Sequence, residues 1–254
     1  MSLSEERRER KAGVLLIFEV ASRLLLRSTT ITSAAVFFHR FYMTQSFYDY
    51  PRYPMAMCCL FLAGKSEETP KKCIDFVSHA RRVLTENGLN QEAAHFGVSD
   101  PRTDVVVHLE RTLLQVLKYD TVVDKPFERM REFVMRMDFA HDDQLEILRT
   151  AWNFCKDLFL TTIIIEWEAE VLAVGVVHLA TRVQKLSAII GDRWYEKFVP
   201  SICIEIVEHV CHEILDTMLS KRPTPSTSTL TFIVPRSTGN TSPYLRQQLR
   251  GNLQ

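Results

Sequence analysis

Glycine and proline are scarce in this chain, with 8 and 10 of 254 residues, and the prolines fall between periodic apolar segments instead of inside them. A proline inside a helix removes a hydrogen bond and clashes with the preceding turn. The periodic segments are therefore free to be helical along their whole length.

Long apolar runs are missing as well. No segment reaches the roughly 18 to 20 uninterrupted apolar residues of a membrane span, because segments such as 13–26 carry charges, here Glu19 and Arg23. The N-terminus, SLSEERRERK, is charged where a signal peptide would be apolar. We expect a soluble intracellular protein without a membrane span.

Neither sign of charge is in excess, since Lys+Arg and Asp+Glu both total 31. A protein that holds nucleic acid by neutralising its phosphates is usually basic, so no nucleic-acid partner is expected, although a local patch stays open. The six cysteines lack CxxC spacing, and most lie in apolar helical patterns where a free cysteine behaves as a small hydrophobic residue. This pattern indicates a reducing compartment.

Sequence motifs of catalysis are also absent. The chain contains no GxGxxG, GxxxxGKS, GxSxG or HExxH pattern, so we expect no catalytic residue, no cofactor and no small-molecule substrate. Glu67 and Glu68 are adjacent, and neighbouring residues diverge by about 100° on a helix, which favours a solvated helix end over an acid/base pair. His209, Cys211 and His212 could be imagined as zinc ligands. At helical spacing, however, the cysteine points to the core and the histidines to another side, so we expect no metal site.

What the chain does contain is an apolar stretch of small residues at 54–64, PMAMCCLFLAG, followed at once by the charged segment KSEE at 65–68. Small residues allow neighbouring backbones to approach closely. The stretch therefore predicts a central buried helix with one charged end. Lys65 at that end could lay its stem over apolar surface and keep its amine in water. Alternatively, it could pair with Glu110 and join two helix ends as one recognition surface.

Two series of helices are predicted, one on each side of an extended linker that ends at Lys125. The second series opens at Pro126 and copies the central stretch at 168–185, EAEVLAVGVVHLATRVQK, where LATR takes the place of LAGK. This repeat is one of pattern more than of identity. The predicted fold is all-α, with two tandem five-helix domains at 1–125 and 126–220.

Within the first series, Thr69 and Pro70 form a cap-plus-proline signature that predicts the start of a fourth helix. Asn87 and Gly88 form a stop signal at its end. A polar loop is expected to follow at 89–99. After Lys221 the composition changes to Ser, Thr and Pro without a sustained period, so residues 221–254 are predicted to be a mobile tail.

Three runs of the first half resemble the first cyclin box of the transcriptional cyclins, and within that subgroup the cyclin K branch most. They are HRFYMTQSF at 39–47, PRYPMAMCCLFLAGKSEETPKKC at 51–73 and HLERTLLQVLKYD at 108–120. Two runs of the second half, AWNFCKDLFLTT at 151–162 and WEAEVLAVGVVHLATR at 167–182, resemble the second cyclin box. The resemblance covers most of the chain and leaves out the tail.

This resemblance implies a nuclear protein with no enzymatic activity of its own. Such a cyclin binds a cyclin-dependent kinase, presses on the kinase's C-helix and holds the kinase's active-site Lys-Glu pair in place. Kinases of this subgroup phosphorylate the C-terminal domain of RNA polymerase II, which implies a regulatory subunit in transcription elongation. By the same resemblance, the kinase-binding residues are Phe61, Lys65, Glu68, Glu110, Leu114 and Tyr119.

Two other classes of protein stay open. His39 supports the transcriptional subgroup, because cell-cycle cyclins usually carry Asp at this position. The cyclin L group, linked to splicing, is the first alternative, although its motif is usually closer to KxEExPRR than to the KSEETPKK found at 65–72. The second alternative is a cyclin-fold adaptor of the general transcription factor kind, which docks on DNA; the balanced charge speaks against it.

Overall fold

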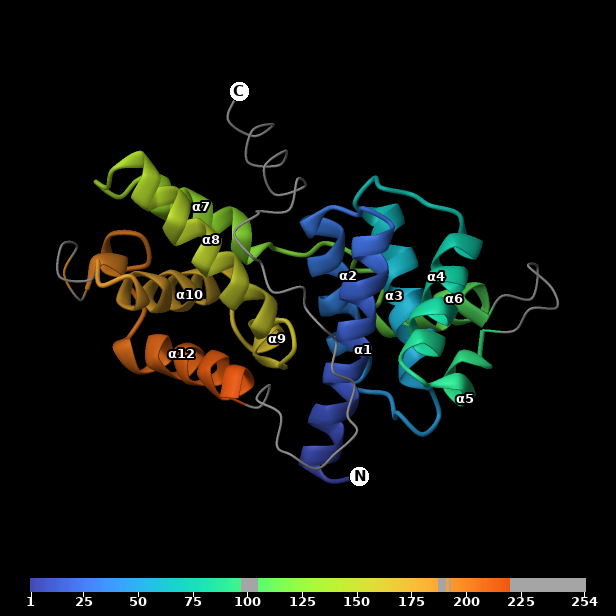
Figure 1. Cartoon of the computed structure of the whole chain (residues 1–254). Coiled ribbons are helices and arrows are strands. Elements are labelled where there is room, and N and C mark those ends of the chain that lie inside the picture. Colours follow the sequence, from blue (N-terminus) through green and yellow to red (C-terminus); the bar gives the residue numbers. More distant parts are fainter. Residues whose placement is uncertain (97–104, 187–190, 192, 220–254) are drawn as a thin grey trace. The chain divides into compact units, whose positions relative to one another are not determined.

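The computed structural model describes residues 1–96, 105–186, 191 and 193–219. All regular secondary structure among these residues is helical, and they belong to one compact unit (Figure 1). The predicted all-α fold is confirmed. The predicted tail at 221–254 lies outside the described residues, as do residues 97–99 of the predicted loop at 89–99. The described part of that loop is not all irregular, because it contains the short helix α5 (Asn90–Ala93).

In the first half, helix α3 lies at the centre. It packs against α1, α2, α4 and α6, and its residues 53–60 are all buried, so the prediction of a central buried helix is confirmed. The helices described in this half are α1 (Leu3–Arg23), α2 (Ser28–Phe41), α3 (Arg52–Ser66), α4 (Cys73–Glu86), α5 (Asn90–Ala93) and α6 (Val105–Val116).

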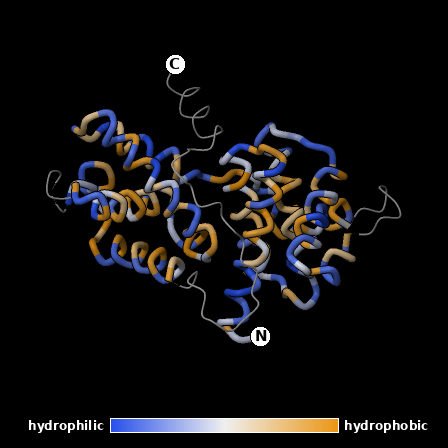
Figure 2. Tube along the Cα trace, viewed as in Figure 1, coloured by the Kyte–Doolittle hydropathy of each residue, from blue (hydrophilic) through white to orange (hydrophobic). Residues whose placement is uncertain are grey.

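In the second half, helix α10 takes the central place and packs against α7, α8 and α12. Residues 172–181 of α10 are buried throughout, as expected from its likeness to the stretch in α3. The helices described here are α7 (Pro126–Met135), α8 (His141–Leu158), α9 (Ile163–Glu166), α10 (Ala169–Val183), the 3-10 helix η1 (Trp194–Lys197) and α12 (Ile204–Leu219). The outer helices, among them α7 and α12, carry hydrophobic and hydrophilic residues in alternation (Figure 2).

Two local predictions about the first half are wrong. Helix α4 begins at Cys73 and not at Thr69-Pro70, because the Thr69 N–H donates to the Gly64 carbonyl at 2.9 Å and so belongs to the end of α3. The helical period of this segment also predicts Ile74 on the core side with Val77 and Leu84, yet Ile74 is 47% exposed. The core face of α4 begins at Phe76, which lies two residues and therefore about 200° round the helix from Ile74. The stop signal is confirmed, since Gly88 has φ +77°.

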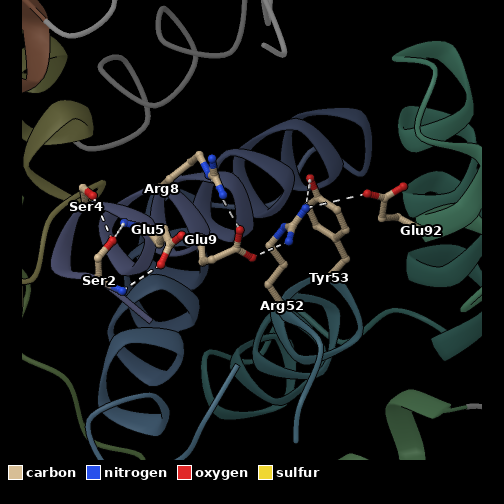
Figure 3. A network of polar contacts seen from close by, with 8 residues as sticks. All are labelled: Ser2, Ser4, Glu5, Arg8, Glu9, Arg52, Tyr53 and Glu92. Carbon is tan, nitrogen blue, oxygen red and sulfur yellow. Dashed lines mark hydrogen bonds and ion pairs between the residues drawn. The ribbon is translucent and has the colours of Figure 1, made fainter. Parts of the chain in front are cut away.

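A polar network fixes the N-terminal half of α1 against α3 and α5 (Figure 3). Ser2 and Glu5 form a capping box at the start of α1, which satisfies backbone donors that the helix itself cannot pair. One turn further on, Glu9 forms an ion pair with Arg52 of α3, and Arg52 reaches Glu92 of α5 at 3.8 Å. The Arg52 guanidinium also lies 4.4 Å from the centroid of the Tyr53 ring.

His39 of α2 joins the two halves. Its side chain is fully buried, and Nε2 lies 2.9 Å from the Phe159 carbonyl at the end of α8. A carbonyl can only accept, so Nε2 carries the proton and Nδ1 faces the buried guanidinium of Arg10 at 3.5 Å. Arg10 also donates to the carbonyls of His39 and Tyr42 at 3.1 and 2.8 Å. His39 is therefore a satisfied interior histidine, as its place in the sequence indicates.

Candidate functional site

The end of α3 and the middle of α6 meet through Lys65 and Glu110. The lysine Nζ lies 2.7 Å from Glu110 Oε1 and 2.8 Å from Oε2. It also lies 4.2 Å from the centroid of the Phe61 ring, one turn earlier on α3. Of the two interpretations of Lys65, the structure shows the pairing with Glu110, and the same ammonium also lies over the Phe61 ring.

This pair lies at the surface. The Lys65 side chain is 47% exposed and the Glu110 side chain 16%. Phe61 is half-buried, with its ring edge against Phe76 of α4 at a centroid distance of 5.7 Å. The lysine is therefore held in one geometry by a ring and a carboxylate while part of it stays open to a partner.

Glu68 occupies the left-handed position that closes α3. Its φ is +53°, and its N–H reaches the Lys65 carbonyl at 3.4 Å, while the next N–H, that of Thr69, bonds to Gly64. These two hydrogen bonds form a Schellman motif, in which the left-handed residue is usually glycine. The Glu68 side chain is exposed.

Helix α6 ends in the same way. Lys118 and Tyr119 have φ of +53° and +61°, and the Tyr119 N–H donates to the Leu114 carbonyl at 2.9 Å. The Tyr119 side chain is 67% exposed. Leu114 lies one turn beyond Glu110 on the same face of α6 and is half-buried. Two helix ends, each closed by a left-handed turn, thus carry the predicted residues.

The structure brings three of the six predicted residues, Phe61, Lys65 and Glu110, into direct contact. Leu114 and Tyr119 follow on α6 and its end, joined by a backbone hydrogen bond. Glu68 extends from the end of α3. The kinase-binding role of all six stays a prediction.

Glu67 is a residue of this site that sequence reasoning missed, because the sequence predicts it with Glu68 at a solvated helix end and it is instead mostly buried. Its carboxylate accepts a hydrogen bond of 2.7 Å from the Ser33 hydroxyl of α2 and lies 3.2 Å from the ammonium of Lys125. The side chains of Glu67 and Lys125 are only 14% and 19% exposed. Glu67 therefore holds the end of α3 to α2 and to the linker that precedes α7. No pattern in the sequence distinguishes Glu67 from its neighbour, because both are acidic residues in one short charged segment.

The residues considered as zinc ligands do not converge. Cys211 is buried and its Sγ donates to the Gly175 carbonyl at 3.4 Å, and burial raises the pKa of its thiol to about 11. His209 and His212 are both exposed. In the described part of the chain, no group of three or more His, Cys, Asp or Glu side chains could hold a metal ion. In the same part, no helix is long and apolar enough to cross a membrane.

Comparisons with known proteins identify the family. The profile of the cyclin N-terminal domain matches residues 2–122. Cyclin-K of Homo sapiens is 40% identical over 83% of this chain, and Cyclin-K of Danio rerio is 39% identical over 87%. The chain belongs to the cyclin family. The prediction of a cyclin of the transcriptional subgroup, within it most similar to the cyclin K branch, is confirmed.

The matches cover only part of these relatives. The chain spans 36% of the human protein and 52% of the Danio rerio protein. Among solved structures, this cyclin is similar to a chain of the CAK complex of Chaetomium thermophilum bound to ATP-gamma-S, with a TM-score of 0.66, 19% identity and coverage of 85% of this chain and 65% of that one. A chain of the yeast RNA Pol II CTD kinase CTDK-1 complex gives a TM-score of 0.66 at 16% identity, with coverage of 85% and 67%. At these identities the two structures show the fold.

Proposed function

We propose that this cyclin is a non-catalytic regulatory subunit, which binds and activates a cyclin-dependent kinase of the transcriptional group acting on the C-terminal domain of RNA polymerase II. The observation that carries the proposal is the Lys65–Glu110 pair, which holds the end of α3 and the middle of α6 in one geometry at the surface. The two similar solved structures are chains of a CAK complex and of a Pol II CTD kinase complex. These complexes support a kinase partner.

The mechanism is a shift in population. A protein kinase is active only when the β3 lysine and the C-helix glutamate form an ion pair, and the position of the C-helix controls that pair. A cyclin that binds the active arrangement better than the inactive one favours the active state by its difference in affinity. The surface that distinguishes the active from the inactive kinase consists of Phe61, Lys65, Glu68, Glu110, Leu114 and Tyr119.

The fixed geometry of this surface suits that task. Side chains that are ordered before binding lose less conformational freedom when the partner arrives. Lys65 is ordered by a ring and a carboxylate, and the left-handed turn that ends α6 fixes the backbone of Tyr119. The kinase therefore meets the Lys65 side chain already in place.

The proposal also covers organisation and location. Residues 1–125 and 126–220 form two cyclin boxes, and the kinase contact lies on the first alone. The central helices α3 and α10 support this division, because each packs against the main helices of its own half. Because the kinase's substrate is RNA polymerase II, the proposed location of the protein is the nucleus.

Reconstitution tests the function. A purified transcriptional cyclin-dependent kinase is assayed on a peptide of repeated polymerase heptads, with and without the chain. The chain alone is expected to transfer no phosphate, and its addition to raise the kinase's turnover strongly. Unchanged kinase activity at a saturating concentration of the chain, with each transcriptional kinase in turn, would contradict the proposal.

A further inference from the structure

A cleft of about 490 Å³ lies beside the linker between the two halves, away from the Lys65–Glu110 pair. We call it the linker cleft. It is lined by Val36 and Arg40 of α2, residues 122–124 and Pro126 of the linker, Arg129 of α7, and residues 164–170 with Leu172 around α9 and α10. None of the residues predicted to bind the kinase lines it.

Carboxylates outnumber cations in the linker cleft. The four acidic side chains of its lining are Asp124, Glu166, Glu168 and Glu170, and the two basic ones are Arg40 and Arg129. The cations are already engaged: Arg129 lies 3.3 Å from Glu170 and 3.4 Å from Glu132, and Arg40 lies 3.7 Å from Asp120. Across the described part of the chain, no cation lies within ion-pair distance of Asp124 or Glu168. The lining of the cleft therefore carries an excess of negative charge.

Part of the lining of the cleft is apolar or aromatic. Val122 is exposed and Ile165 is half-buried, and the indole of Trp167 is half-buried beside Glu168. An indole face attracts a cation by its quadrupole, and most strongly when the site is partly dry. A neighbouring carboxylate can take a guanidinium by two parallel hydrogen bonds. Trp167 and Glu168 together thus fit a planar cation better than a compact ammonium.

We propose that the linker cleft binds an arginine-bearing segment of a partner protein, with the guanidinium between Trp167 and the carboxylates of Asp124 and Glu168. The flanking apolar side chains of that segment lie on Val122 and Ile165, the apolar lining residues that are not buried. The cyclin would then hold a second protein while its first half holds the kinase. This site is independent of the proposed kinase surface.

Two peptides of one sequence test the proposal on the full chain. They are acetyl-Ala-Val-Arg-Val-Ala-amide and the same peptide with citrulline, the neutral isostere of arginine. The readout is the indole N–H resonance of Trp167, assigned with the Trp167→Phe variant. The arginine peptide is expected to shift this resonance in a saturable way and to bind about tenfold or more tightly than the citrulline peptide.

Variants distinguish binding in the cleft from nonspecific attraction of the peptide to negative charge. Glu168→Gln and Asp124→Asn should weaken binding of the arginine peptide several-fold. Glu146→Gln is a matched loss of charge at an exposed position of α8 outside the cleft, and it should leave the affinity for the peptide unchanged. Kinase recovery should be the same for all three variants, so a failure here and a failure of the proposed function are distinguishable.

Four results would overturn the proposal. They are equal shifts with both peptides, no shift with either at millimolar concentration, an equal loss in Glu146→Gln and Glu168→Gln, and binding of a phosphoserine peptide in place of the arginine peptide. The last result would mean that Arg40 and Arg129 dominate the cleft.

Discussion

Lys65 and Glu110 join α3 to α6 by two N···O contacts of 2.7 and 2.8 Å, and the lysine lies over the Phe61 ring. An exposed ion pair contributes little to stability, because solvent screens it and two side chains lose freedom. Its value is geometric: it fixes the end of α3 in relation to the middle of α6.

Replacing the lysine should therefore leave the fold nearly as stable. Lys65→Met keeps an unbranched side chain next to Phe61 and removes the charge, and the free energy of unfolding should change by less than about 1 kcal/mol. Urea denaturation measures it. A loss several times larger would mean that the pair is a structural element in its own right.

Glu68 should show opposite effects on stability and on binding. Its φ of +53° is strained for a residue with a Cβ, so Glu68→Gly should raise the free energy of unfolding by about 0.5–1 kcal/mol. Because the side chain is lost from the proposed surface, kinase affinity should fall. Glu68→Ala is the control: it removes the same carboxylate and should bind as weakly, without the gain in stability. A less stable glycine variant would contradict the account of the turn.

Gly175 should not tolerate a methyl group. A Cβ at this position of α10 would lie 2.4 Å from Val210 Cγ1 of α12, so Gly175→Ala should cost about 1–3 kcal/mol. Val210→Ala makes room for the added Cβ. The double variant should therefore lose less stability than the sum of the two single variants, which thermal unfolding can measure. Additive losses would show that the two helices do not meet at this point.

His39 should make stability depend on pH. Burial, helped by the Arg10 guanidinium, lowers the pKa of His39 to about 4, against the hydrogen bond to Phe159, which raises it. At a pH between this value and the ordinary pKa of about 6.5, the histidine is protonated in the unfolded chain and neutral in the folded chain. This contribution is complete above pH 6.5 and is lost as the pH falls toward 4, by at most about 3 kcal/mol.

Denaturation curves at a series of pH values measure that slope. His39→Gln should flatten it, whereas His141→Gln, at an exposed position of α8, should leave it unchanged. A slope that is the same in the chain and in His39→Gln would assign the pH dependence to other groups.

The central helices could be predicted from the periodicity of small residues, and the Lys65–Glu110 pair from the resemblance to the cyclin box. Both signals lie in short continuous runs of the sequence. Glu67 could not be predicted, since its inward direction depends on Ser33 and Lys125, which lie far away in the sequence. The prediction of a helix start at Thr69-Pro70 failed for a related reason. A residue type that can cap the start of a helix can also donate the N–H that closes a Schellman motif at the end of the preceding helix. The linker cleft combines three separate segments, so no local pattern indicates it.

Kinase capture by a charge reversal tests the central claim most directly. Lys65→Glu places a carboxylate against Glu110, and Lys197→Glu makes the same charge change at an exposed position of η1 in the second half. Both variants are immobilised, and kinase recovery from nuclear extract is compared with that of the unmodified chain, after circular dichroism has shown equal helicity. The account predicts strongly reduced recovery with Lys65→Glu and full recovery with Lys197→Glu; equal recovery with both would contradict it.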